Sequence, residues 1–284
     1  MTRLPTYFLS HGGGPWPWLS GHFRDQYGAL EASLKRIVQE LGGKPRTVLM
    51  VSGHWEADEF SVMAGTRPGM VYDYAGFPAH TYTIRYPAPG SPALAARVQA
   101  LLQAAGFAAR LDATRGFDHG AFAPLAVMYP EADVPVVQLS LKVGYDPAMH
   151  FGAGRALAPL RDEGVLIIGS GLSYHNLREF GAGAKDVSAA FDAWLQQTLL
   201  HATPALRSQH LLQWERAPAA RQAHPREDHL VPLFVALAAA ENEPAACVYH
   251  EDAFFGGVTV SSFRFGESVR EGGSPGVSSV LLQQ

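Results

Sequence analysis

Residues 47–54 read Thr-Val-Leu-Met-Val-Ser-Gly-His, a continuous apolar run that ends in a histidine. The same arrangement recurs in TYFLSH (6–11) and in VLIIGSGLSYH (165–175). Short apolar runs without alternating polar residues are typical of strands that are buried on both faces of a sheet. Because ligands of open α/β sheets bind outside the carboxyl ends of the strands, we expect the three terminal histidines to converge there.

Further apolar runs alternate with longer helical patterns, which predicts an α/β fold in which helices cover a central sheet. The predicted strands are 6–10, 47–52, 60–64, 134–139, 165–169, 246–249 and 258–264. The predicted helices are 22–41, 92–105, 120–129, 147–161, 186–201 and 228–240. No linker divides the sequence, so we expect a single domain over residues 1–284. The Gly/Pro-rich segment 72–92 shows no clear periodicity, which is typical of a functional or mobile loop.

The composition, 47% hydrophobic and 17% charged, predicts a packed core. A net charge of -4 without a Lys/Arg cluster argues against a nucleic-acid partner. The single cysteine, Cys247, excludes an internal disulfide and a cysteine-based zinc site, and it suits a reducing compartment. The N-terminal residues do not resemble a signal peptide, and no apolar run reaches 18 residues. We therefore expect a cytoplasmic protein with no membrane partner.

The chain has 12 histidines, so their placement must carry any argument about a site. His11, His54 and His175 follow the three apolar runs quoted above. A fourth candidate, His229, lies in HPREDHLVPLF at the start of the last predicted helix, which we expect to be amphipathic. Its neighbours His224, Glu227 and Asp228 are equally able to bind a metal, and their spacing does not choose among them. Neutral imidazoles with at most one carboxylate favour Zn(II) or non-haem Fe(II) over Ca²⁺ or Mg²⁺.

The remaining histidines and the aromatic segments allow two interpretations. In RGFDHGAFAPL, Asp118 is either a helix cap beside an incidental His119, or His119 is an acid/base group. We assign five histidines to polar helix faces or strand edges: His22, His150, His201, His210 and His250. Tyr82, Arg85 and the segment 15–18 are candidates for the pocket lining, although ordinary packing also explains the tryptophans of that segment.

The string His-Gly-Gly-Gly (11–14) also occurs in the oxyanion loop of esterases. That chemistry requires a G-x-S-x-G nucleophile elbow, and the nearest approach, GSGLS (169–173), does not fit the pattern. A serine hydrolase is therefore rejected, and a P-loop is excluded because no G-x-x-x-x-G-K-[ST] is present. The glycines favour either a tight turn or a close approach of the backbone to a ligand.

The sequence resembles the class III extradiol ring-cleavage dioxygenases of the LigB-like superfamily, in particular the DOPA 4,5-dioxygenase type. The resemblance covers about residues 6–265, and its strings occur in order: SHGGG, SGHW, YDYAGFPAHTYTIRYPAPGSP, GFDHGAFAPL, YPEADVPVVQLSL, GSGLSYHNL and EDHLVPL. It implies a single α/β domain with a central mixed sheet, and an enzyme that cleaves a catechol such as DOPA with O2. It also implies one non-haem Fe(II) or Zn(II) per chain.

The resemblance further assigns roles to individual histidines. His11, His54 and His229 match the metal ligands, and His175 matches the acid/base histidine, which is sometimes a further metal ligand. His119 matches a second catalytic histidine that contacts substrate or oxygen. In the LigB subunit the third ligand is a glutamate, whereas this sequence has His229 at that position.

Two other functions are compatible with the same histidines. A zinc-dependent hydrolase would use them to activate water. A non-enzymatic binding protein, similar to the Memo-like proteins, would keep the fold without the activity. Oxygen uptake with a catechol distinguishes the dioxygenase from both, and the sequence does not define an oligomeric state.

Overall fold

The fold is built on one eight-stranded mixed sheet, which the computed structural model describes within residues 3–269. The strands are β1 (Thr6–Ser10), β2 (Thr47–Ala57), β3 (Phe60–Met63), β4 (Ala109–Asp112), β5 (Val136–Lys142), β6 (Val165–Gly171), β7 (Ala245–Phe254) and β8 (Val258–Phe265). Their order in the sheet is β4-β3-β5-β2-β6-β1-β8-β7. The central strands β5, β2, β6 and β1 are parallel, while β8 runs antiparallel to β1 and to β7. The predicted α/β fold with a central mixed sheet is confirmed.

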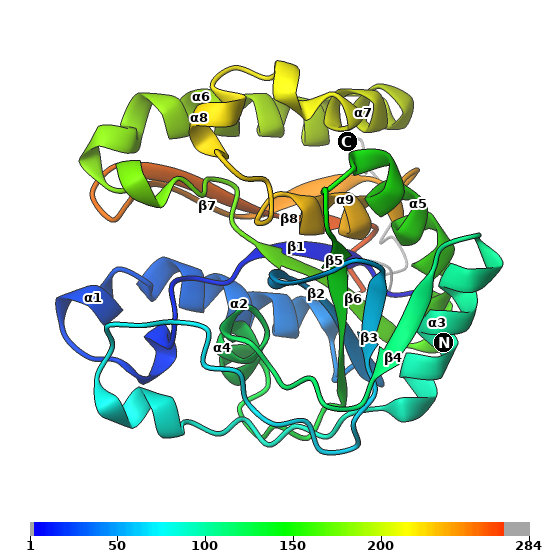
Figure 1. Ribbon diagram of the computed structural model, residues 1–284. Helices are drawn as coiled ribbons and strands as arrows, with labels where there is room; N and C mark the ends of the chain where they lie inside the picture. Colours follow the sequence, from blue (N-terminus) through cyan, green and yellow to red (C-terminus); the bar gives the residue numbers. More distant parts are fainter. Residues whose placement is uncertain (1–2, 270–284) are drawn as a thin grey trace, which may run out of the picture.

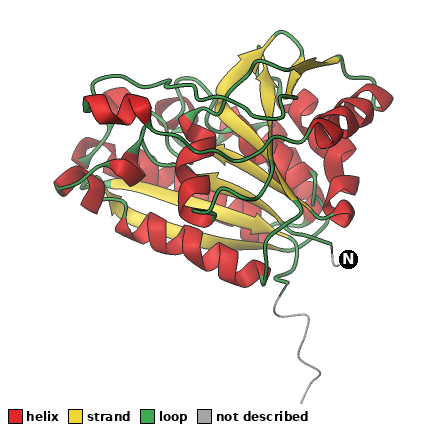
Figure 2. Ribbon diagram, turned by 90° about the horizontal axis from the view of Figure 1, so that it is seen from below, coloured by secondary structure: helices red, strands yellow, loops and turns green. Residues whose placement is uncertain are grey.

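Helices cover both faces of the sheet (Figures 1 and 2). The α-helices are α1 (His22–Asp25), α2 (Gly28–Leu41), α3 (Pro92–Ala104), α4 (His119–Met128), α5 (Pro147–Leu157), α6 (Lys185–Gln196), α7 (Pro204–Leu212), α8 (Ala220–Ala223) and α9 (Val231–Ala238). Shorter helical turns are η1 (Trp16–Trp18), η2 (Ala79–Thr83), η3 (Ala158–Glu163), η4 (Leu177–Glu179), η5 (Ala182–Ala184), η6 (Gln197–His201) and η7 (Trp214–Arg216). Figure 1 shows α2 and α4 on one side of the sheet and α6, α7 and α9 on the other.

Strand β2 is longer than predicted, and its extra residues place a site histidine. The sequence predicts a strand that ends at Ser52, whereas β2 continues to Ala57 with a register shift against β5 between Val51 and Glu56. His54 therefore lies in an irregular part of the strand and not beyond its end. Such bulges re-aim a side chain, and they are common next to active sites. The missed strand β4 is a four-residue edge strand with two exposed residues, so it lacks the apolar run of the others.

Several predicted helices are interrupted or shortened. The predicted helix 22–41 is broken between α1 and α2, where the buried ring of Tyr27 stacks on Trp16 at a centroid distance of 4.8 Å. The predicted helix 147–161 tightens after Leu157 into the turn η3, which contains Pro159. The predicted helix 186–201 ends in the π-helical turn η6. Helices α7 and α8 were not predicted, although Thr203 caps α7 and Pro204 opens it.

The last predicted helix, 228–240, begins only at Val231. It is not amphipathic as predicted, because all eight of its residues are buried against β1, β6 and α5. The close approach depends on two glycines of β6: a Cβ atom on Gly169 would lie 2.2 Å from the carbonyl oxygen of Pro232, and one on Gly171 would lie 2.0 Å from that of His229. Only a residue without a side chain allows this contact.

His22, His201, His210 and His250 are exposed, as predicted, but the predicted surface position of His150 is wrong. His150 is fully buried on α5: its Nδ1 donates to the carbonyl of Asp146, and its Nε2 accepts from the backbone N–H of Lys142. Burial lowers the pKa of His150 to about 4, so this ring is a neutral structural group. Among residues 3–269, no helix has the length and apolar character needed to span a membrane.

At the opposite end of the molecule, a buried arginine joins β1 to α9. The Arg161 side chain is 1% exposed, donates to the carbonyls of Leu4 and Ala239, and pairs with both carboxylate oxygens of Glu243. Removing this desolvated charge is destabilising, because the carbonyls of Leu4 and Ala239 lose the donor that pairs them.

We predict that Arg161→Met lowers the free energy of unfolding by about 3 kcal/mol, measured by urea denaturation. Arg155→Met is the matched control, because Arg155 makes a similar two-pronged pair with Glu241 but is 52% exposed. That variant should lose less than about 1 kcal/mol. Equal losses in the two variants would contradict the assigned role of the buried pair.

Candidate metal centre

Five histidines line one cavity of about 530 Å³ beside the carboxyl ends of the central strands. They are His11, His54, His119, His175 and His229. Three of them, His11, His54 and His229, place one ring nitrogen each within 4.8 Å of one another. The cavity also contains Asp73 and Asp228. The structure thus brings together the histidines that the sequence analysis singled out.

His11 is held by the backbone at the end of β1. Its N–H donates to the carbonyl of Gly171 (3.1 Å), and its own carbonyl accepts from the indole N–H of Trp16 (2.8 Å). The ring Nδ1 lies 2.6 Å from the carbonyl of Gly12, so Nδ1 carries the proton and Nε2 keeps its lone pair. This Nε2 is buried and has no hydrogen-bond partner within the described residues. A bound metal would satisfy such an orphaned acceptor.

His54 and His229 face each other across the cavity floor, with their Nε2 atoms 3.1 Å apart. Two ligand nitrogens bound to one tetrahedral zinc at ordinary bond lengths are about 3.3 Å apart. The Nδ1 of His54 lies 3.1 Å from Asp73, and the Nδ1 of His229 lies 3.1 Å from Asp228. A carboxylate beside the outer nitrogen is typical of metal-binding histidines. The Nδ1 of His229 makes no hydrogen bond within the described residues, so Asp228 lies beside this ring without fixing its tautomer. These three imidazoles therefore fit a metal ion.

Four of the five imidazoles of the site, those of His11, His54, His175 and His229, are held neutral. Burial lowers the pKa of His54 and of His175 to about 3, and it lowers the pKa of His11 and His229 well below the ordinary value. The neighbouring imidazoles act in the same direction, because several positive charges at this spacing would repel. Neutral rings with free lone pairs are the form that metals require.

Asp73 is the functional residue that the sequence analysis missed. Its carboxylate accepts hydrogen bonds from the Nδ1 and the backbone N–H of His119, at 2.9 and 3.1 Å, and lies beside His54. Burial alone would raise the pKa of Asp73, but the hydrogen bonds from His119 lower it below its ordinary value. One feature of the sequence could have indicated Asp73: it is the one acidic residue in the Gly/Pro-rich segment between Tyr72 and Pro92.

The side chain of Asp118 does not cap α4, contrary to the first of the two interpretations of the RGFDHGAFAPL segment. It occupies the N-cap position, but its fully buried carboxylate accepts from Ser52, Arg115 and Gln138 and makes no side-chain cap bond. The guanidinium of Arg115 also lies over the ring of Trp55. Asp118 thereby links β2, β5 and the start of α4, which carries His119 into the cavity.

His175 and His229 stack in parallel, with ring centroids 3.4 Å apart and an interplanar angle of 14°. The Nδ1 of His175 lies 3.8 Å from Asp228, beyond hydrogen-bond distance. Burial raises the pKa of Asp228 to about 6. Of the other candidates in this segment, His224 is buried against the carbonyl of Ser173 outside the cavity, and Glu227 pairs with Arg221.

The glycines of the HGGG string form a turn packed against aromatic rings. Gly12 and Gly14 have φ angles of +78° and +53°, and a Cβ on either would lie within 2.7 Å of Trp16 or Phe77. Trp16 is buried and does not line the cavity, so its role is packing. Tyr82 contacts Tyr74 of the cavity wall, and Arg85 is exposed; neither lines the cavity, so their substrate role stays a prediction without geometric support.

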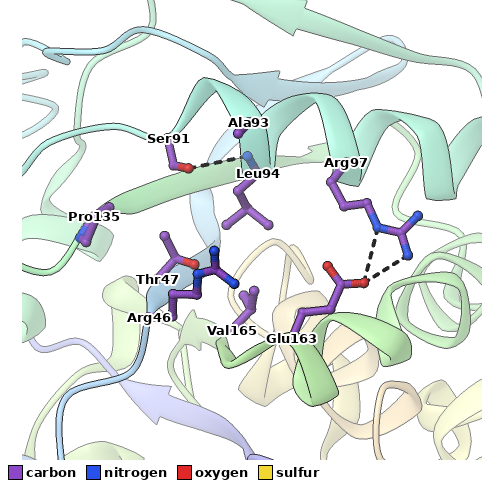
Figure 3. A pocket seen from close by; sticks show the side chains of 9 residues that line it. All are labelled: Arg46, Thr47, Ser91, Ala93, Leu94, Arg97, Pro135, Glu163 and Val165. Carbon is purple, nitrogen blue, oxygen red and sulfur yellow. Dashed lines mark hydrogen bonds and ion pairs between the residues drawn. The ribbon is translucent and has the colours of Figure 1, made fainter. Parts of the chain in front are cut away.

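A second cavity, of about 420 Å³, lies at the amino ends of the strands and contains no histidine (Figure 3). It is bordered by Thr47 and Val165, the first residues of β2 and β6. In Figure 3 Arg97 contacts Glu163 and Ser91 caps α3, while no partner is drawn for Arg46 or Thr47. The histidine cavity is thus the candidate site.

Comparisons with known proteins give the same assignment. Residues 5–266 match the family described as the catalytic LigB subunit of aromatic ring-opening dioxygenase. The chain is 40% identical to a 4,5-DOPA dioxygenase extradiol of Beta vulgaris, covering 92% of this chain and 96% of the relative. A protein of the same name from Escherichia coli K12 is 34% identical, covering 93% and 96%.

A solved structure has the same fold. The crystal structure of an E. coli K12 protein, described as uncharacterized, matches with a TM-score of 0.75 and 30% identity, covering 93% of this chain and all of the other. The chain therefore belongs to the LigB family of aromatic ring-opening dioxygenases, oxidoreductases of the extradiol class, as the sequence predicted.

Proposed function

We propose that the chain cleaves the ring of a catechol beside its two hydroxyl groups, at one metal ion held by His11, His54 and His229. The observation that supports this most strongly is the convergence of three imidazoles, with the Nε2 atoms of His54 and His229 3.1 Å apart and that of His11 buried without a partner. The substrate class, a catechol, follows the names of the relatives, which are DOPA dioxygenases, and the metal follows the chemistry of the donor set.

Non-haem Fe(II) is the proposed metal, with Zn(II) as the alternative ion that the same three nitrogens accept. When bound, the metal supplies Lewis acidity and a path for electrons from the catechol to O2. The chain itself supplies only neutral nitrogen ligands here, since the two carboxylates, Asp73 and Asp228, lie next to the outer Nδ1 atoms. The role of the carboxylates is then to orient the rings.

His175 is proposed as the acid/base residue. Burial lowers the pKa of His175 in the metal-free site to about 3, so the ring is neutral at physiological pH and offers a free lone pair. The negative charge of a bound catecholate beside it would raise that pKa and let the ring hold the proton of a catechol hydroxyl. It would return this proton to an oxygen later in the reaction. Its stacking on His229 holds it beside the metal ligands, so it can also serve as a further ligand in a resting form.

His119 is proposed to hold a substrate or O2 oxygen. Its hydrogen bond to Asp73 fixes the orientation of the ring, which lines the cavity. Asp73 therefore positions two rings at once, His119 and His54. We further propose that residues 1–284 act as one domain in a reducing, cytoplasmic compartment, consistent with the single Cys247.

The proposal is tested by measuring oxygen consumption of anaerobically Fe(II)-reconstituted protein with a panel of catechols. We expect uptake of one O2 per catechol and the yellow absorbance of a ring-opened semialdehyde. Metal-loaded protein that consumes no oxygen with any catechol would overturn the proposal and favour the hydrolase or the binding protein.

We predict that two histidine variants lose different properties, one the metal and the other the turnover. His229→Ala should lose the metal, because it removes one of three ligands. His175→Ala should retain the metal while its turnover falls by about 10² to 10⁴. Metal content after desalting and oxygen uptake at saturating catechol measure the two effects. His210→Ala, on the exposed face of α7, is the control and should match the unaltered protein in both.

The buried imidazoles also predict how pH affects the metal-free protein. Their folded-state pKa values lie well below 6.5, so as the pH falls from 7 to 5 only the unfolded chain takes up their protons. Stability should therefore decrease with falling pH, by up to about 1.4 kcal/mol per pH unit for each such histidine. Asp228 offsets part of this loss, because its raised pKa makes the folded state bind a proton first.

Urea denaturation of the metal-free protein at pH 7, 6 and 5 measures this dependence. His224→Gln, which removes one buried imidazole whose pKa is lowered to about 3, should reduce the slope by one proton. An unfolding free energy that stays constant from pH 7 to pH 5 would show that these rings are protonated in the folded state, against the assignment.

A further inference from the structure

The outer part of the histidine cavity is walled by apolar side chains. They are Phe23, Phe77, Leu177, Phe180, Phe254 and Phe255. The histidines lie deeper in the cavity than the apolar side chains. His11 and His229 are 2% exposed, whereas Phe23 is 36% exposed and Leu177 is 69% exposed. The metal-binding nitrogens therefore lie on the floor, and the apolar groups surround the mouth.

The aromatic rings of this wall form a continuous row of contacts in space. Ring centroids are separated by 5.9 Å between Phe23 and Phe77, by 5.3 Å between Phe23 and Phe255, and by 5.7 Å between Phe180 and Phe255. They come from separate segments: α1, the loop before η2, the residue after η4, and the β7–β8 turn. Phe255 has a φ of +50°, a left-handed conformation that is unfavourable for a bulky residue and is found at functional sites.

The wall contains no basic group. Among the described residues that line the cavity, the ionisable side chains other than histidine and tyrosine are Asp73 and Asp228, both acidic. Two arginines lie near the wall in sequence but not on it. Arg24 lies over the ring of Trp16 and pairs with Glu31, and Arg178 is exposed outside the cavity. A substrate carboxylate held against this wall, away from the proposed metal on the floor, would lose hydration without meeting a cationic side chain of the described lining, which is unfavourable.

We infer that the preferred catechol carries an uncharged, apolar substituent on its ring, an alkyl or aryl group, and not the carboxylate of DOPA. The inference rests on the proposed function, because it assumes that the two hydroxyls lie at the histidines. The substituent then extends toward the mouth and covers Phe23 and Leu177, which are otherwise exposed. Each buried methylene should raise kcat/KM about fourfold.

The test compares kcat/KM for five substrates of the Fe(II)-reconstituted enzyme: catechol, 4-butylcatechol, 3-(3,4-dihydroxyphenyl)propanoate, DOPA and dopamine. We expect 4-butylcatechol to exceed catechol and to exceed both carboxylates by at least about tenfold. Equal or faster turnover of either carboxylate would overturn the inference, and so would faster turnover of the cation dopamine. Failure to oxidise catechol itself would overturn the proposed function, and this inference with it.

Two neighbouring substitutions locate the effect on the wall. Leu177→Arg places a guanidinium at the mouth and should raise kcat/KM for the propanoate at least about tenfold relative to 4-butylcatechol. Arg178→Gln is the matched control and should leave that ratio unchanged. If Arg178→Gln instead abolishes selective turnover of the propanoate, Arg178 is the carboxylate-binding residue and the inference is wrong.

Discussion

The site depends on the contact between Gly171 and the backbone of His229. The carbonyl of Gly171 accepts from the N–H of His11, and the next N–H, that of Leu172, donates to the carbonyl of His229, each at 3.1 Å. A Cβ atom at residue 171 would lie 2.0 Å from that same carbonyl oxygen. One residue at the end of β6 thus sets the positions of two imidazoles that are 218 positions apart in the chain, His11 and His229. The bulge of β2 brings the third, His54, opposite them.

The parts that could be predicted from the sequence are those that depend on local periodicity. Apolar runs followed by His11, His54 and His175 predicted the strands and the edge of the sheet at which these rings meet, and the resemblance placed His229. Residues alone did not choose His229 over His224 or Asp228, because that choice depends on how closely the segment before α9 approaches β6. Asp73 was missed for the same reason, since its partners lie 19 and 46 residues away.

Burial explains why the neutral state of the site is stable. Charged imidazoles this close together would repel, and desolvation already disfavours protonation of His11, His54, His175 and His229. The outer nitrogen of His11 is oriented by the carbonyl of Gly12, which leaves its inner nitrogen as an acceptor, and the outer nitrogens of His54 and His229 lie 3.1 Å from the carboxylates of Asp73 and Asp228. A buried acceptor without a partner is destabilising, so folding and metal binding are coupled. The same arrangement that weakens the metal-free fold at low pH makes it ready for a metal.

The floor and the mouth of the cavity are built by different kinds of structure. The floor is attached to the central strands and to the first residue of α4, which pack on both faces and have little freedom to move. The mouth is formed by loops and turns from segments that are distant in sequence, and the rings of Phe23, Phe180 and Phe255 contact one another across them. A substitution at the mouth can therefore change the charge and shape of the surface that contacts the ring substituent of the catechol, while the imidazoles keep their positions. This separation lets the mouth discriminate between ring substituents without moving the imidazoles on the floor.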